Sequence, residues 1–143
     1  MTDHPAVLLD TCAAIWVVNA SPLSAAVTGM IQRAGQTGGV FVSTASAWEI
    51  GLLSRPRPNR NTLQFLPDPK AWFARLLALP GVKEAPITPA IAIDSWFLPG
   101  DLHPDPADRL IIATARHLGM PIVTSDRRII AYAGAGHVAV IPC

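Results

Sequence analysis

Four acidic residues lie among apolar residues, where an α/β chain exposes side chains at the end of a strand or the start of a helix. They are Asp10, Glu49, Asp108 and Asp126. An ionised carboxylate in apolar surroundings loses hydration, so it is costly unless a cation or a hydrogen-bond donor pairs with it. A cluster of carboxylate oxygens suits Mg²⁺ or Mn²⁺, which can activate a water and neutralise charge on a phosphodiester. If the four acids converge, they predict a metal-dependent hydrolytic site.

The elements that must position these acids alternate along the chain. Five short apolar runs predict buried strands over residues 6–9, 40–42, 82–85, 121–124 and 138–141. Segments with helical spacing separate them, over residues 11–18, 22–34, 45–53, 69–79, 89–97, 106–118 and 127–132. Strands that alternate with helices predict a parallel sheet covered by helices on both faces. Four of the helices have an N-cap residue followed by proline at their start, at Ser21-Pro22, Asp68-Pro69, Thr88-Pro89 and Asp105-Pro106.

This order of elements places the four acids near one rim of the sheet. In parallel α/β sheets the functional crevice lies beyond the carboxyl ends of the strands. Asp10 ends the first predicted strand, and Asp126 follows the fourth with Ser125 between them. Glu49 lies one turn into a helix, and Asp108 lies in the first turn of another, where the helix dipole favours an anion. Each acid taken alone also fits an ordinary role as an N-cap, a salt-bridge partner or a solvated loop residue.

Length and composition favour one soluble domain over residues 1–143. The formal net charge is only +1, which argues against a protein that coats nucleic acid but leaves room for a nuclease that holds phosphate through a metal. The cysteines, at positions 12 and 143, have no zinc spacing and predict no disulfide framework, and His103 and His117 also lack partners at ligand spacing. With no signal-peptide pattern and no apolar run of ~18 residues, we expect a cytoplasmic protein that does not enter a membrane.

Four sequence blocks carry a family resemblance. They read LLDT at residues 8–11, STASAWEI at 43–50, HPDPADRLIIATA at 103–115 and VTSD at 123–126. In this order and spacing they resemble PIN-domain proteins, and in particular the VapC-type ribonuclease toxins of prokaryotic toxin–antitoxin pairs. The resemblance runs from about residue 7 to residue 141. One departure is the segment 59–63, Asn-Arg-Asn-Thr-Leu, where relatives usually carry a shorter Gly-Arg-Leu-type segment.

The resemblance implies a flavodoxin-like three-layer α/β/α sandwich with a five-stranded parallel sheet. It implies a Mg²⁺- or Mn²⁺-dependent endoribonuclease that cleaves RNA, pairs with a small antitoxin protein and forms a homodimer. The antitoxin's C-terminal segment would lie over the cleft. By position, the catalytic and metal-binding acids would be Asp10, Glu49, Asp108 and Asp126. Asp105 would be a further contact to metal or substrate, and Thr11 and Ser125 would be polar supports or phosphate contacts.

Basic residues near these acids leave two interpretations open. Arg55, Arg57 and Arg60 lie in a proline-rich segment and could guide phosphate into the cleft, or could simply be solvated. Arg109 follows Asp108 and could pair with a carboxylate or bind RNA, or could equally make a structural pairing.

The apolar content favours self-association. Half the residues are hydrophobic, which predicts more apolar surface than one small core can bury. The alternative is that a sheet buried on both faces needs this much apolar sequence. The candidates for an interface between two copies are Ile15, Trp16, Trp48, Ile50, Leu52 and Leu53.

Three functional hypotheses follow from the sequence. The first is an endoribonuclease toxin, because an idle site has no physical reason to keep four costly carboxylates. The second is a non-catalytic PIN-fold module that binds RNA or a protein partner. The third is a phosphatase or DNase that uses the same cation chemistry.

Overall fold

A computed structural model describes residues 4–19, 23–59 and 61–143, and these contain five strands and seven helices. The strands are all parallel and lie in the order β3-β2-β1-β4-β5. They are β1 (Ala6–Leu9), β2 (Gly39–Ser43), β3 (Val82–Ala85), β4 (Ile122–Thr124) and β5 (Val140–Pro142). The order reverses at β1, so β2 and β4 flank it on either side. This is the predicted five-stranded parallel sheet, and a crevice is expected at the carboxyl end of β1.

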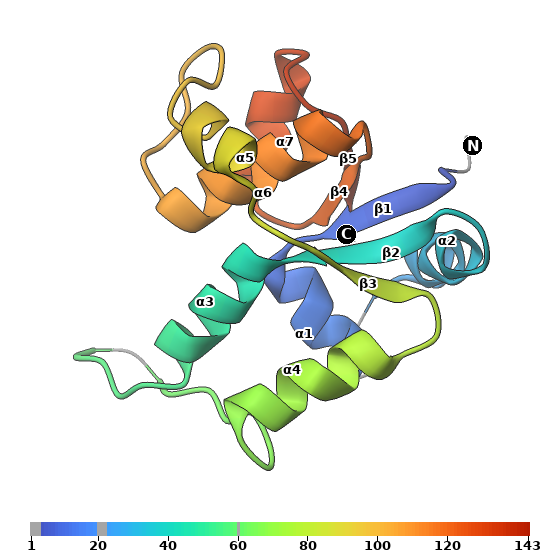
Figure 1. Cartoon of the computed structure of the whole chain (residues 1–143), viewed down its shortest axis with the longest axis vertical. Helices are drawn as coiled ribbons and strands as arrows, with labels where there is room; N and C mark the ends of the chain where they lie inside the picture. Colours follow the sequence, from blue (N-terminus) through green and yellow to red (C-terminus); the bar gives the residue numbers. More distant parts are fainter. Residues whose placement is uncertain (1–3, 20–22, 60) are drawn as a thin grey trace.

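The sheet is covered on both faces, as predicted, and β1 shows why. Val7 and Leu9 point to one face while Leu8 points to the other, because side chains alternate along a strand. All three are fully buried. The face beneath Val7 and Leu9 packs against α1 (Thr11–Asn19), α2 (Ala25–Gln36) and α4 (Pro69–Ala78). The opposite face packs against α6 (Pro106–Leu118) and α7 (Arg127–Gly134), which appear with α5 (Pro89–Asp94) on one side of the sheet in Figure 1.

Helix starts follow the predicted capping chemistry. Asp68, Thr88 and Asp105 each accept a backbone N–H at the third helical position, directly before a proline. Gly119 ends α6 with φ 68°, a left-handed conformation that a glycine adopts without strain. The helix predicted from residue 22 begins instead at Ala25, with Ser24 as its N-cap; Ser21 and Pro22 lie outside the described residues.

Two predicted boundaries are wrong by several residues. The helix expected over 89–97 ends at Asp94, because the chain turns at Ser95, whose hydroxyl donates to Ala92 O at 2.7 Å. The strand expected over 138–141 is β5, two residues later and in register with β4. The remaining helix, α3 (Thr44–Leu53), follows β2 directly and carries Glu49. In the described part of the chain, no helix is both long and apolar enough to cross a bilayer.

Candidate active site

The carboxyl ends of β1 and β4 and the N-terminal ends of α6 and α7 enclose a cavity of about 190 Å³, which we call the acidic pocket. All four acids that the sequence singled out line it, although they lie up to 116 positions apart in the chain. Its lining residues are Asp10, Thr11, Cys12, Glu49, Asp105, Asp108, Ser125, Asp126 and Arg128.

Asp10 lies deepest, with 6% of its surface exposed. Its Oδ1 accepts the N–H of Ala13 at 2.8 Å, which caps the start of α1, and its Oδ2 accepts the hydroxyl of Thr124 at 2.5 Å. Burial outweighs these two hydrogen bonds and raises the pKa of Asp10 to about 6, with a smaller contribution from the charges of Asp108 and Asp126. Near neutral pH this carboxylate therefore holds its charge only against a desolvation cost.

Glu49 reaches the pocket from α3. Its Oε1 accepts the hydroxyl of Thr11 at 2.5 Å, and the Thr11 oxygen lies 3.0 Å from the Ser46 hydroxyl. Both Thr11 and Ser46 are buried, so this link between α1 and α3 fixes the Glu49 head group. Burial, with repulsion from Asp108 and Asp105, raises the pKa of Glu49 to about 7 despite the Thr11 hydrogen bond.

Asp108 is oriented from two sides. Asp105 caps α6 by accepting the Asp108 N–H at 3.0 Å, which sets the backbone at the start of the helix. The Asp108 Oδ2 lies 2.7 Å from His103 Nε2, and both side chains are only 13% exposed. Burial raises the pKa of Asp108, and the His103 hydrogen bond opposes the rise. His103, which has no partner at ligand spacing in the sequence, thus contacts a site acid in the fold.

Asp126 behaves differently from the other three acids. As the N-cap of α7 it accepts the N–H groups of Arg128 and Ile129, at 2.8 and 3.4 Å. Burial alone would raise the pKa of Asp126, but these N–H groups and the Arg128 guanidinium lower it overall. The Thr124 hydroxyl oxygen also accepts the Asp126 N–H at 3.0 Å, so one threonine joins Asp126 to Asp10. Asp126 therefore stays ionised more readily than Asp10, Glu49 or Asp108.

One cation is among the residues that line the acidic pocket. The Arg128 guanidinium nitrogen lies 3.6 Å from Asp108 Oδ2 and 3.5 Å from Asp126 Oδ2. Five carboxylates therefore face one guanidinium, which leaves a local excess of negative charge. A divalent cation would relieve that excess, because it pairs with the carboxylates and removes their mutual repulsion.

The donor chemistry fits Mg²⁺ or Mn²⁺, but the side chains are not yet arranged around an ion. Among residues 4–19, 23–59 and 61–143, no group of three or more His, Cys, Asp or Glu side chains is placed to hold a metal. The hydrogen bonds above explain this, since Thr124, Thr11 and His103 each occupy an oxygen of one acid. Binding an ion would require these carboxylates to turn toward one another.

None of the candidate arginines that the structure describes lines the acidic pocket. Arg109 turns away from Asp108 and donates to Ser95 O at 3.1 Å and to Leu102 O at 3.0 Å. Its guanidinium also lies 5.4 Å from the centre of the Trp96 ring, so it ties the segment after α5 to α6. These contacts agree with the structural alternative for Arg109. Arg55 and Arg57 lie beyond α3 and are not among the lining residues, and Arg60 is outside the described residues.

Three residues at this site are absent from the candidates drawn from the sequence: Arg128, His103 and Thr124. Of the three, only Thr124 could have been identified from the sequence, because it is a hydroxyl residue that ends an apolar strand just before Ser125-Asp126. His103 and Arg128 lie in a loop and at a helix start, where polar residues are ordinary.

Comparisons with known proteins agree with this architecture. The chain matches the family model described as PIN domain over residues 7–135. The chain belongs to the PIN-domain family. It is also 34% identical over 125 residues to Ribonuclease VapC22 of Mycobacterium tuberculosis (strain ATCC 25618 / H37Rv), a match that covers 86% of this chain and 88% of that protein.

Solved structures share this PIN-domain fold at low sequence identity. VapBC2 from Rickettsia felis, bound to a DNA fragment from its promoter, gives a TM-score of 0.65 at 11% identity over 96% of this chain and 98% of that chain. FitAcB from Neisseria gonorrhoeae gives a TM-score of 0.60 at 20% identity, over 94% of this chain and 96% of that chain. These likenesses confirm the PIN-like α/β fold that the sequence predicted.

Proposed function

We propose that this PIN-domain protein, acting as one domain over residues 1–143 in the cytoplasm, is a divalent-metal-dependent endoribonuclease. The observation that carries the proposal is the acidic pocket, in which burial raises the pKa of Asp10 to about 6 and of Glu49 to about 7. Acids that are costly to ionise, clustered at the carboxyl rim of a parallel sheet, are typical of a functional site rather than of a structural one.

Each residue of the acidic pocket has a proposed role. Asp10, Glu49, Asp108 and Asp126 would hold Mg²⁺ or Mn²⁺, with Asp105 as a further oxygen at the rim. When bound, such an ion would activate water and neutralise charge on the scissile phosphate. Thr124, Thr11 and His103 orient the carboxylates of Asp10, Glu49 and Asp108 respectively. Thr11 and Ser125 remain candidates for substrate contacts because both line the pocket.

Arg128 links the acids to the substrate. Its Nη2 lies between Asp108 and Asp126 and offsets part of their repulsion. An arginine presents a planar set of N–H donors that suits a phosphate as well as a carboxylate. The Arg128 side chain is 58% exposed, so its other N–H groups can bind the phosphate of the substrate.

The relatives suggest the biological setting. Ribonuclease VapC22 is named for action on RNA, and VapBC-5 from Mycobacterium tuberculosis is described as a member of a toxin–antitoxin family. We propose that this chain is likewise the toxin of such a pair and that a small antitoxin protein covers its cleft. Basic side chains of the antitoxin would complement the acidic rim.

Cleavage by the purified protein tests the activity. We expect Mg²⁺ or Mn²⁺ to release fragments from a structured RNA with single-stranded loops, and EDTA to abolish the release. Duplex DNA should stay intact, which separates a ribonuclease from a metal-dependent DNase. RNA binding without any cleavage in either metal would instead support the non-catalytic module.

Exposed apolar side chains support a homodimer. Trp48 and Leu52 of α3 are 61% and 45% exposed, and Ile93, Trp96 and Phe97 in and after α5 are 61%, 60% and 80% exposed. Both α3 and α5 pack against α6. Among the other interface candidates, Ile50 is a core residue at 2% exposure, and Ile15, Trp16 and Leu53 are half-buried.

Light scattering at micromolar concentration tests the homodimer. We expect a mass near twice the 15.2 kDa of the chain, because two copies would bury these apolar side chains against each other. A second sample carrying Trp48→Glu should shift toward the monomer. A wild-type mass of 15.2 kDa would show that the exposed side chains do not mediate self-association.

A further inference from the structure

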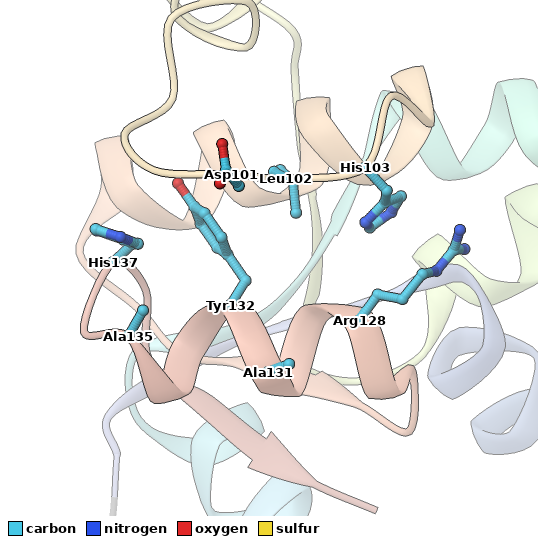
Figure 2. Close-up of a pocket in the computed structure, with 8 residues that line it drawn as sticks. All are labelled: Asp101, Leu102, His103, Arg128, Ala131, Tyr132, Ala135 and His137. Carbon is cyan, nitrogen blue, oxygen red and sulfur yellow. The ribbon is translucent and has the colours of Figure 1, made fainter.

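A second cavity, of about 320 Å³, lies between residues 101–103 and α7. Figure 2 shows its lining, with Asp101, Leu102 and His103 on the loop above and Arg128, Ala131 and Tyr132 on the helix below. His137 closes the end opposite Arg128 (Figure 2). We call this cavity the loop pocket, and its volume lies in the range of small-molecule sites.

The loop pocket adjoins the acidic pocket. Arg128 lines both cavities, and His103 lines the loop pocket while its Nε2 contacts Asp108 in the acidic pocket. A ligand that spans Arg128 would therefore place one part among the carboxylates and the next part in the loop pocket. A polymer with a repeating backbone can do this.

The two cavities differ in charge. The acidic pocket has five carboxylates and Arg128, whereas the loop pocket has Arg128, His103 and His137 against the single carboxylate of Asp101. A phosphate is repelled by the carboxylates but can accept hydrogen bonds from the arginine and the imidazoles. The rim carboxylate of Asp101 can accept in turn from a sugar hydroxyl or a base amino group.

The loop pocket is held in shape by contacts that do not depend on a ligand. The Tyr132 hydroxyl donates to Pro99 O, and the Arg116 guanidinium donates to His137 O. Gly100, at φ 71°, packs so closely that an added Cβ would lie 2.7 Å from His137 Nε2. Both walls are therefore tied to one another, so a ligand would meet a preformed cavity and bind with a smaller loss of conformational entropy.

Two rings lie side by side in the wall of the cavity: the Tyr132 ring is buried, and the His137 ring is partly exposed. The Tyr132 and His137 rings lie 4.9 Å apart between centroids, at 39° to each other. Nucleobases stack on aromatic and imidazole rings. The Asp101 carboxylate in the same lining can favour a base that carries an amino group.

We propose that the loop pocket binds the nucleotide adjacent to the scissile phosphate, in a single-stranded segment of RNA. The inference rests on the proposed function and names the part of the substrate that the carboxylates do not reach. Its base lies against the partly exposed ring of His137, which Tyr132 supports from behind, and its phosphate contacts Arg128 and His103. A base inside a duplex would first have to leave its stack, so the pocket selects unpaired segments.

Filling the loop pocket with a larger side chain tests whether it binds a nucleotide. Ala131 is exposed and lines the cavity, so Ala131→Phe places a ring where the nucleotide would lie without disturbing the core. Ala26→Phe is the matched control, because Ala26 is also exposed and lies on α2, which packs on the opposite face of the sheet from α7. His137→Ala is a second variant, which removes the ring but keeps the carbonyl that Arg116 holds.

Binding is measured apart from cleavage. The probe is a fluorescent single-stranded RNA of random sequence, about 12 nucleotides long, titrated in EDTA and followed by anisotropy. We expect Ala131→Phe and His137→Ala to weaken binding about tenfold or more, while Ala26→Phe leaves it unchanged. Equal affinity of the wild type and both pocket variants overturns the proposal. An equal loss for a duplex RNA of the same length also overturns it.

A second readout separates this inference from the proposed function. In Mg²⁺, sequencing of the fragment ends should show a base preference next to the cut in the wild type, and Ala131→Phe should flatten it. If the wild type cleaves with a preference that Ala131→Phe does not alter, the loop pocket is not the site that reads the base. If the wild type never cleaves RNA but the binding losses occur, the nuclease proposal fails and the binding site stands.

Discussion

Asp10→Asn is expected to reduce RNA cleavage by about a thousandfold or more while the protein remains folded. Asparagine has the same shape as aspartate, so its oxygen can still accept the Ala13 N–H and its amide can donate to Thr124. What it lacks is the negative charge that would hold a divalent cation. Initial rates at saturating Mg²⁺ measure the loss, and Asp108→Asn should behave in the same way.

The fold of these variants is checked by melting in EDTA. The melting temperature of Asp10→Asn should equal or exceed that of the wild type, because a buried charge and its repulsion from Asp108 and Asp126 are removed. Asp94→Asn, an exposed acid on α5 outside the pocket, is the matched control and should keep full activity. Full activity in Asp10→Asn would refute the assignment of the acidic pocket as the catalytic site.

The metal-free protein is expected to lose stability as pH rises from about 4 to about 7. The folded-state pKa of Asp10 is raised from 3.8 to about 6, and that of Glu49 from 4.5 to about 7. Both acids bind protons more tightly in the folded state, so their protonation stabilises the fold below the unfolded pKa values. That stability is lost as pH rises through the folded values. The Asp10 shift alone corresponds to on the order of 3 kcal/mol.

Asp126 does not disturb this profile. The pKa of Asp126 is lowered from 3.8, so the stability it contributes is complete above that value and disappears only in stronger acid. Thermal melting in EDTA at several pH values measures the profile. In Asp10→Asn the decline with pH should be shallower, since one of the acids with a raised pKa no longer titrates.

Mg²⁺ should reverse the loss of stability near neutral pH. A ligand that binds only the folded state stabilises it by mass action, by about 2.7 kcal/mol at a concentration of about 100 times its dissociation constant. We expect this gain in the wild type and little of it in Asp10→Asn. A melting temperature in EDTA that rises between pH 4 and 7 would contradict the proposed metal site. So would a wild-type melting temperature that does not change when Mg²⁺ is added.

The order of the elements and the set of acids could be predicted from the sequence because both depend on local patterns. Alternating strands and helices specify a parallel sheet, and the carboxyl ends of its strands share one edge. Asp10 directly follows one apolar strand, and Asp126 follows another with Ser125 between, so any such sheet brings them to the same rim. The Asp-Pro and Thr-Pro pairs likewise specified helix starts, since each cap bonds to N–H groups within its own first turn.

The direction of individual side chains could not be predicted in the same way. Arg109 is next to Asp108, yet adjacent residues on a helix point about 100° apart, so Asp108 faces the pocket while Arg109 reaches Ser95 and Leu102. Ile50 is a second example: it was expected at an interface between two copies. It follows Glu49 on α3, but the same rotation turns it into the core.

The sequence by itself determined the parallel sheet, most helix starts and the four acids at one rim. Only the tertiary structure decided which side chains meet them. Arg128 lies between Asp108 and Asp126 because α7 packs beside the start of α6, and His103 reaches Asp108 because the loop before α6 folds back over it. These contacts join elements whose separation and angle depend on the packing of the whole core, and no local sequence pattern encodes that geometry.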